Sequence, residues 1–137
     1  MNRNSGLAWG VDRLEKMLRV RNLTKDRVIA DRALIADTSD KRRTGLLKHT
    51  GLDPGEGLWI VPTEGVHMFG MKFDIDVLFL DKKRKVVKAS ANMAASGFSR
   101  RMSVCLTAHS VLELPAGMLA KTQTVVGDQL ELEKYDG

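Results

Sequence analysis

The 137-residue chain contains a single cysteine, Cys105, and no long hydrophobic run. One cysteine excludes an internal disulfide framework and a multi-cysteine metal site, and it fits a reducing compartment. No apolar stretch approaches the roughly 18 residues of a membrane-spanning helix. The N-terminal residues carry charge without the continuous apolar segment of a secretory signal. We therefore expect a cytoplasmic protein with no membrane span.

Several motifs that carry chemistry are also missing. The glycine-rich phrases TGLDPGEG and PAG lack the spacing of a P-loop or a dinucleotide-binding turn. No serine lies in the Gly-x-Ser-x-Gly elbow of a serine hydrolase. A zinc site needs three or four ligands, and the three histidines of the chain do not form the HxxxH pair that would supply two of them. Cys105 and His109 lack the local signature of a nucleophile and its base. We therefore expect no cofactor and no metal, and we assign no catalytic residue.

The remaining composition is that of one globular domain. Hydrophobic residues make up 43% of the chain and charged residues 28%, which is enough apolar material for a core of its own. The formal net charge of +5 is a modest excess. Residues 1–15 are polar apart from an isolated Trp9, and they are predicted to form a loosely ordered arm. Residues 16–137 are predicted to form a single β-rich domain.

Short apolar or alternating segments separated by turn residues predict strands. Thr38 and Ser39 are good N-caps for a short helix, and Pro115 suits the first turn of another. No βαβ rhythm is evident, so we predict a mostly β (β-rich α+β) fold. Its expected form is a compact antiparallel sandwich or partly open barrel with one or two short helices. The clearest predicted strands are residues 27–37, 58–62, 74–81, 110–114 and 129–133.

Five phrases occur in an order that resembles the domain of unknown function 192 family: RRTGLL, GEGLWIVP, VHMFGMKFDIDVLFLD, VLELPAG and GDQLEL. The resemblance covers roughly residues 15 to 133 and implies a small β-rich fold with short helices, but no activity. Similar family members often have a cysteine where this chain has Thr63, so thiol chemistry is absent at that position. Three further departures are Met68 for threonine, Lys72 for arginine and Asp74 for proline.

Asp76 is the most unusual residue in the central phrase. Strand alternation puts it on the same face as Leu78 and Leu80, where an unpaired carboxylate is costly. It must meet a backbone donor or a cation, or hold a proton. We favour a structural carboxylate bonded to loop amides or to an arginine such as Arg42 over an acid or base working in a cleft.

The residues around this phrase predict a concave binding surface. Aromatic and thioether side chains would supply contact area, two polar groups would orient a ligand, and an arginine would neutralise an acid. We predict a non-catalytic binding or accessory module for a small or peptidic ligand. The candidate ligand-binding residues are Arg42, Trp59, His67, Phe69, Met71 and Asp76.

Two alternatives remain open. The protein could be an enzyme that uses Asp76 and His67 as an acid–base pair within hydrogen-bond reach of each other or of one water. It could also bind a polyanion weakly if its basic clusters share one face, although sparse aromatic residues argue against a nucleic-acid partner. Those clusters are Arg42-Arg43, residues 82–85 and Arg100-Arg101.

Overall fold

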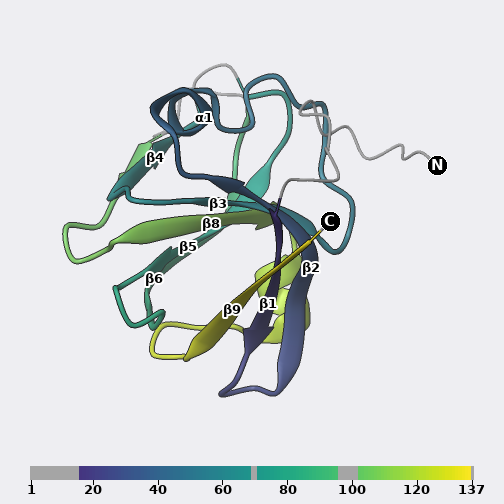
Figure 1. Ribbon diagram of the computed structural model, residues 1–137, viewed down its shortest axis with the longest axis vertical. Helices are drawn as coiled ribbons and strands as arrows, with labels where there is room; N and C mark the ends of the chain where they lie inside the picture. Colours follow the sequence, from purple (N-terminus) through teal and green to yellow (C-terminus); the bar gives the residue numbers. More distant parts are fainter. Residues whose placement is uncertain (1–15, 69–70, 96–101, 137) are drawn as a thin grey trace.

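The computed structural model describes residues 16–68, 71–95 and 102–136 (Figure 1). Within these ranges the chain forms nine strands and two short helices. No helix there combines the length and the apolar character needed to cross a bilayer. In chain order the elements are β1 (Lys16–Asn22), β2 (Arg27–Ala36), α1 (Ser39–Thr44), β3 (Glu56–Ile60), β4 (Gly65–His67), β5 (Ile75–Leu80), β6 (Val86–Met93), β7 (Met102–Val104), β8 (Ser110–Pro115), α2 (Met118–Thr122) and β9 (Leu130–Asp136).

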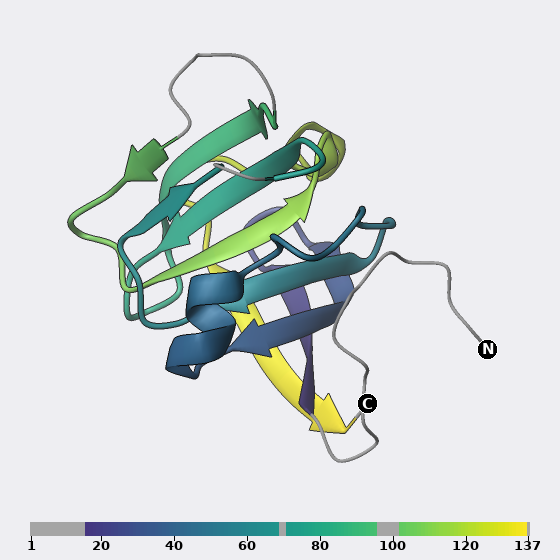
Figure 2. The same cartoon turned by 90° about the horizontal axis from the view of Figure 1, so that it is seen from above.

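Seven strands form one mixed sheet in the order β6-β5-β8-β3-β2-β1-β9, and β4 pairs with β7 separately. The sheet curls until its two edges meet at one end, where Val86 N donates to Asp128 O at 2.9 Å and Leu130 N donates to Arg84 O at 3.0 Å. The barrel is therefore only partly closed, as Figure 2 shows from above. This confirms the predicted β-rich fold with short helices.

One pairing differs from the antiparallel arrangement that the sequence suggests. β2 and β3 are parallel, with Leu34 opposite Leu58, because the chain crosses over through α1 between them. The expectation that the chain has no βαβ unit is therefore wrong for this segment. The crossover carries α1 to one side of the sheet, where it lies near β4 (Figure 1).

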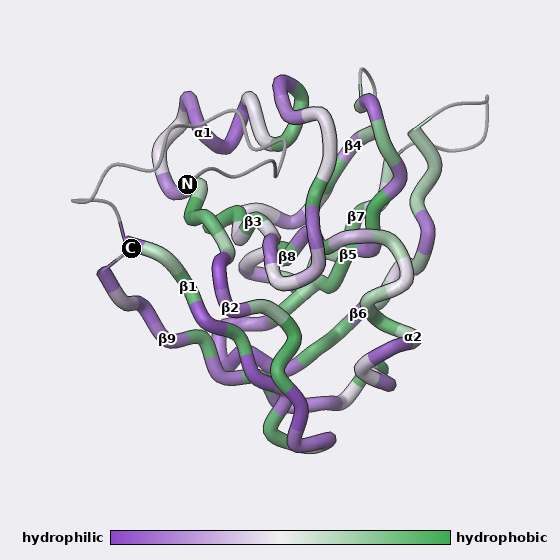
Figure 3. The backbone as a smooth tube through the Cα atoms, turned by 90° about the vertical axis from the view of Figure 1, so that its right-hand side faces the viewer, coloured by the Kyte–Doolittle hydropathy of each residue, from purple (hydrophilic) through white to green (hydrophobic). Residues whose placement is uncertain are grey.

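The three central strands, β3, β5 and β8, are buried on both faces. One face points into the curled sheet and forms an inner core with residues such as Trp59, Leu78 and Leu112. The opposite face forms an outer core with residues such as Leu58 and Val77. Hydrophilic residues gather instead at α1 and along β9 (Figure 3).

Asp76 lies at the start of β5 and is completely buried. One carboxylate oxygen accepts a hydrogen bond from Asn92 N at 2.8 Å. The other accepts from Gly117 N at 3.1 Å and Leu119 N at 2.8 Å. Gly117 is the N-cap of α2 and has no side chain to satisfy these amides, so Asp76 caps the helix from a neighbouring strand. The sequence allowed a bond to loop amides or to an arginine such as Arg42. The structure shows the carboxylate bonded to backbone amides of β6, of the α2 N-cap and of the first turn of α2.

We expect Asp76→Asn to lower the free energy of unfolding by about 2 to 3 kcal/mol. The NH2 group of asparagine would replace one of the two accepting oxygens, so at least one buried backbone N–H would lose its acceptor. Asp74→Asn is the matched control, since Asp74 is exposed and accepts one amide, Ala95 N at 2.9 Å. It should cost about 1 kcal/mol or less. Urea unfolding measures both values. Equal losses in the two variants would show that Asp76 does not have this structural role.

Candidate functional site

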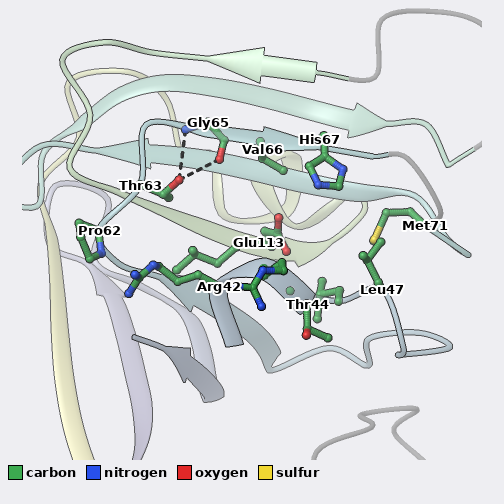
Figure 4. Close-up of a pocket in the computed structure, with 14 residues that line it drawn as sticks. Arg42, Thr44, Leu47, Pro62, Thr63, Gly65, Val66, His67, Met71 and Glu113 are labelled. Atoms are coloured by element: carbon green, nitrogen blue, oxygen red, sulfur yellow. Dashed lines mark hydrogen bonds between the residues drawn. The ribbon is translucent and has the colours of Figure 1, made fainter. Parts of the chain in front are cut away.

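A cavity of about 130 Å³ lies between the end of α1, β4 and the outer face of the main sheet (Figure 4). Its lining combines apolar and polar side chains, and its ionisable residues come from α1, β4 and β8. The lining residues are Arg42, Arg43, Thr44, Gly45, Leu46, Leu47, Ile60, Pro62, Thr63, Gly65, Val66, His67, Met71 and Glu113.

Local sequence features place the α1 wall. Thr38 is the N-cap, as predicted, and its hydroxyl accepts from Lys41 N at 3.2 Å. The helix ends at Gly45, which has a φ of 50° and donates its amide to Lys41 O. Glycine adopts this left-handed conformation without strain. The chain can therefore turn sharply, and Leu46 enters the outer core directly after the helix.

Arg42 connects this wall to the segment before β4. Its Nη1 donates to Asp37 O at 3.0 Å and to Val61 O at 3.5 Å. No carboxylate among the described residues pairs with Arg42, whereas Arg43 pairs with Asp40 at 3.1 Å on the surface. Arg42 therefore brings a positive charge to the cavity that no described acid balances.

The opposite wall is the segment around β4. Thr63 Oγ1 donates to Gly65 O at 3.1 Å, and Thr63 N donates to His109 O at 2.9 Å. β4 then pairs with β7, with Val66 opposite Ser103. These bonds hold Val66 and His67 over the cavity, across from Thr44 and Leu47 in Figure 4.

Glu113 forms the floor of the cavity. It lies in the middle of β8 between Leu58 of β3 and Val77 of β5, and only 4% of its surface is exposed. Among the described residues, no hydrogen bond or ion pair reaches its carboxyl group. Burial raises the pKa of Glu113 to about 8, and no neighbouring cation opposes this shift. At neutral pH the group is therefore a protonated acid, able to donate a hydrogen bond into the cavity.

The candidate residues predicted from the sequence do not all lie at this cavity. Arg42, His67 and Met71 all line the cavity. Trp59 belongs to the inner core on the other face of the sheet, where the Arg84 guanidinium lies 4.8 Å from the centre of its ring. Asp76 is on that face too. Phe69 lies outside the described residues.

The acid–base pair proposed for the enzyme alternative is therefore not assembled. Asp76 bonds three backbone amides on the inner side, while His67 lines a cavity on the outer side. Within the described ranges, no group of three His, Cys, Asp or Glu side chains could hold a metal ion. Of the basic clusters, Arg42-Arg43 borders the cavity, residues 82–85 form the turn between β5 and β6, and Arg100-Arg101 lies outside the described residues.

Glu113 was not among the candidate residues, although the sequence held a signal for it. It interrupts the apolar strand SVLEL, and alternation places it on the same face as Val111. The argument that singled out Asp76 applies equally here, because an acid on a buried face needs a partner or a proton.

Comparison with known proteins identifies the family. The model of the DUF192 family, described as an uncharacterized ACR, matches residues 20–132. The chain belongs to the DUF192 family. A UPF0127 protein from Thermococcus sibiricus is 31% identical over 117 residues, which cover 82% of this chain and 73% of that protein. A UPF0127 protein from Thermococcus gammatolerans is 31% identical over 112 residues, covering 78% and 70%.

The fold also occurs in a solved structure. A protein of unknown function from Novosphingobium aromaticivorans has a TM-score of 0.71 to this DUF192 chain, at 23% identity. The match covers 96% of this chain and 99% of that one. At this identity the likeness shows the fold alone. The family resemblance seen in the sequence is confirmed.

A second buried titratable group, His49, affects how stability depends on pH. Burial, and to a smaller extent the positive charge of Lys72, lowers the pKa of His49 from 6.5 to about 4. Between pH 4 and 6.5 the unfolded chain binds a proton at His49 that the folded chain does not. Stability therefore rises with pH across this window.

Glu113 has the opposite effect. Its folded pKa of about 8 lies above the ordinary value of 4.5, so the folded chain holds a proton that the unfolded chain releases. Stability falls as pH rises from 4.5 to 8 and levels off above 8. Between pH 4.5 and 6.5 the two effects oppose each other, and above pH 6.5 only the Glu113 effect remains.

We expect the free energy of unfolding to fall by about 1.5 kcal/mol between pH 6.5 and 8, with a slope that reaches at most about 1.4 kcal/mol per pH unit. Glu113→Gln should remove this fall because glutamine does not titrate. Glu131→Gln, on an exposed position of β9, should keep it. Guanidinium unfolding at several pH values measures the slope. A slope in Glu113→Gln equal to that of the wild type would contradict the assignment.

Proposed function

We propose that this DUF192 protein is a non-catalytic binding protein whose small ligand occupies the cavity above Glu113. The observation that carries the proposal is the buried Glu113 carboxyl, which faces the cavity without a described partner. Buried polar groups are nearly always hydrogen-bonded. A buried carboxyl group that lacks a hydrogen-bond partner among the described residues therefore marks a place where a ligand binds.

The lining of the cavity supports binding of a small molecule. Ligand sites are typically apolar walls with a few polar groups that fix orientation. Here Leu46, Ile60 and Met71 supply apolar contact, while Arg42 and Glu113 supply polar contact. His67 is placed at the β4 wall to contact the same ligand. Of the predicted candidate residues, this proposal retains Arg42, His67 and Met71.

A binding role is favoured over catalysis by the surroundings of the acid. Acid–base catalysis usually needs a second group positioned to exchange a proton with the substrate. Asp76 is committed to backbone amides, and the Thr63 hydroxyl donates to Gly65 O. Among the described residues that line the cavity, Glu113 alone carries a carboxyl group.

A cavity-filling variant tests the proposal. Fragments of up to about eight heavy atoms, of all charge classes, are added to ¹⁵N-labelled protein and amide shifts are recorded. We expect bound fragments to shift the amides of Thr44, Gly45 and Val66. Leu47→Trp should weaken this binding at least tenfold, because the indole would occupy the cavity.

Leu23→Trp is the matched control, since Leu23 is 46% exposed and does not line the cavity. It should bind fragments as the wild type does. The dispersion of the amide spectrum shows that each variant is folded. Fragments that bind Leu47→Trp and the wild type equally, or that shift amides far from the cavity, would refute the proposal.

A further inference from the structure

The hydrogen-bonding state of Glu113 limits what can bind next to it. The side chain is 4% exposed, and what remains exposed faces the cavity. A neutral carboxyl group offers one strong O–H donor. A ligand atom that accepts this hydrogen bond would complement the floor of the cavity.

The charges around the cavity limit the ligand further. Its ionisable lining groups are Arg42, Arg43, His67 and Glu113. The two arginines are permanently charged, and Arg42 meets no carboxylate among the described residues. A cationic ligand would lie among these arginines, and a neutral Glu113 would not balance its charge. An anionic ligand would meet an unbalanced guanidinium and a neutral donor.

The size of the cavity sets the size of the buried part of the ligand. A cavity of about 150 Å³ can hold a benzene molecule, and this one measures about 130 Å³. It therefore accommodates about six non-hydrogen atoms. Apolar side chains from three segments, including Leu46, Ile60 and Val66, form much of the surface around them.

We propose that the cavity binds a small monocarboxylate whose carboxylate accepts a hydrogen bond from Glu113 and faces Arg42. The short aliphatic part of the ligand packs against the apolar walls. This inference rests on the proposed binding function and names the chemical class of its ligand.

Three compounds of nearly the same shape separate the charge classes: isobutyrate, isobutyramide and isobutylamine. Each is titrated into ¹⁵N-labelled protein at pH 7, and dissociation constants are taken from amide shifts. We expect isobutyrate to bind at least tenfold more tightly than isobutylamine, with isobutyramide between them.

The pH dependence tests the role of the Glu113 proton. Isobutyrate binds the protonated form, so its affinity should fall about thirty-fold between pH 7 and 9.5, as a pKa of about 8 requires. Glu113→Gln keeps a side-chain donor that cannot titrate, and it should bind isobutyrate without this pH dependence. Glu113→Leu, which has no donor, should lose at least tenfold in affinity. His67→Asn should keep the pH dependence, because the titrating group is Glu113.

A variant of Arg42 and a matched control variant test the role of the Arg42 charge. Arg42→Gln should weaken isobutyrate about tenfold and leave isobutyramide nearly unchanged, because only the anion needs the charge. Lys48→Gln removes a positive charge from the same segment without altering the cavity lining, and it should change neither affinity.

The outcomes separate this inference from the proposed function. Tighter binding of isobutylamine than of isobutyrate, or isobutyrate binding that does not change with pH in the wild type, would overturn the carboxylate assignment. So would failure of all three compounds to bind while other fragments shift the cavity amides. Failure of every fragment at this cavity would instead refute the proposed binding function.

Discussion

Burial of β3, β5 and β8 on both faces is the constraint that governs this protein. No side chain on these strands can turn to water, so an acidic residue there must be satisfied by the protein or lose its charge. Asp76 and Glu113 show the two outcomes. Asp76, on the inner face, accepts three backbone amides and holds the start of α2. Glu113, on the outer face, meets apolar neighbours and keeps its proton at neutral pH. The same burial therefore produces a structural carboxylate on one face and a candidate site on the other.

The outer face needs its own cover, and the cavity arises from how that cover is built. The parallel pairing of β2 with β3 requires a crossover, and α1 lies in it. The β4–β7 pair covers the neighbouring part of the sheet. These two pieces are short and are joined through the Arg42 side chain, which donates to Val61 O. They do not fill the space above Glu113. The cavity is therefore a property of the connection between strands rather than of the sheet itself.

Much of the fold could be predicted from local patterns, but the site could not. Alternation in VHMFGMKFDIDVLFLD correctly predicted a buried face for Asp76, and Thr38 was correctly predicted as an N-cap. The parallel partner of β2 is set by pairing between distant segments, which local periodicity does not report. Trp59 was predicted to supply aromatic contact area at the site, yet its strand position turns it to the inner core. Alternation tells which residues share a face, but not which face lies under a cavity, and so Glu113 was not distinguished from a core residue.

The partly closed seam between β6 and β9 also bears on how copies of this protein meet one another. Exposed strand edges can pair with edges of other molecules and begin aggregation. At one end of the barrel, the two edges satisfy each other through the bonds between residues 84–86 and 128–130. Farther along β9, Glu131, Glu133 and Lys134 place charges on the strand that remains at the edge. Closing one end and charging the other protects the edges of this partly open barrel from pairing with edges of other molecules.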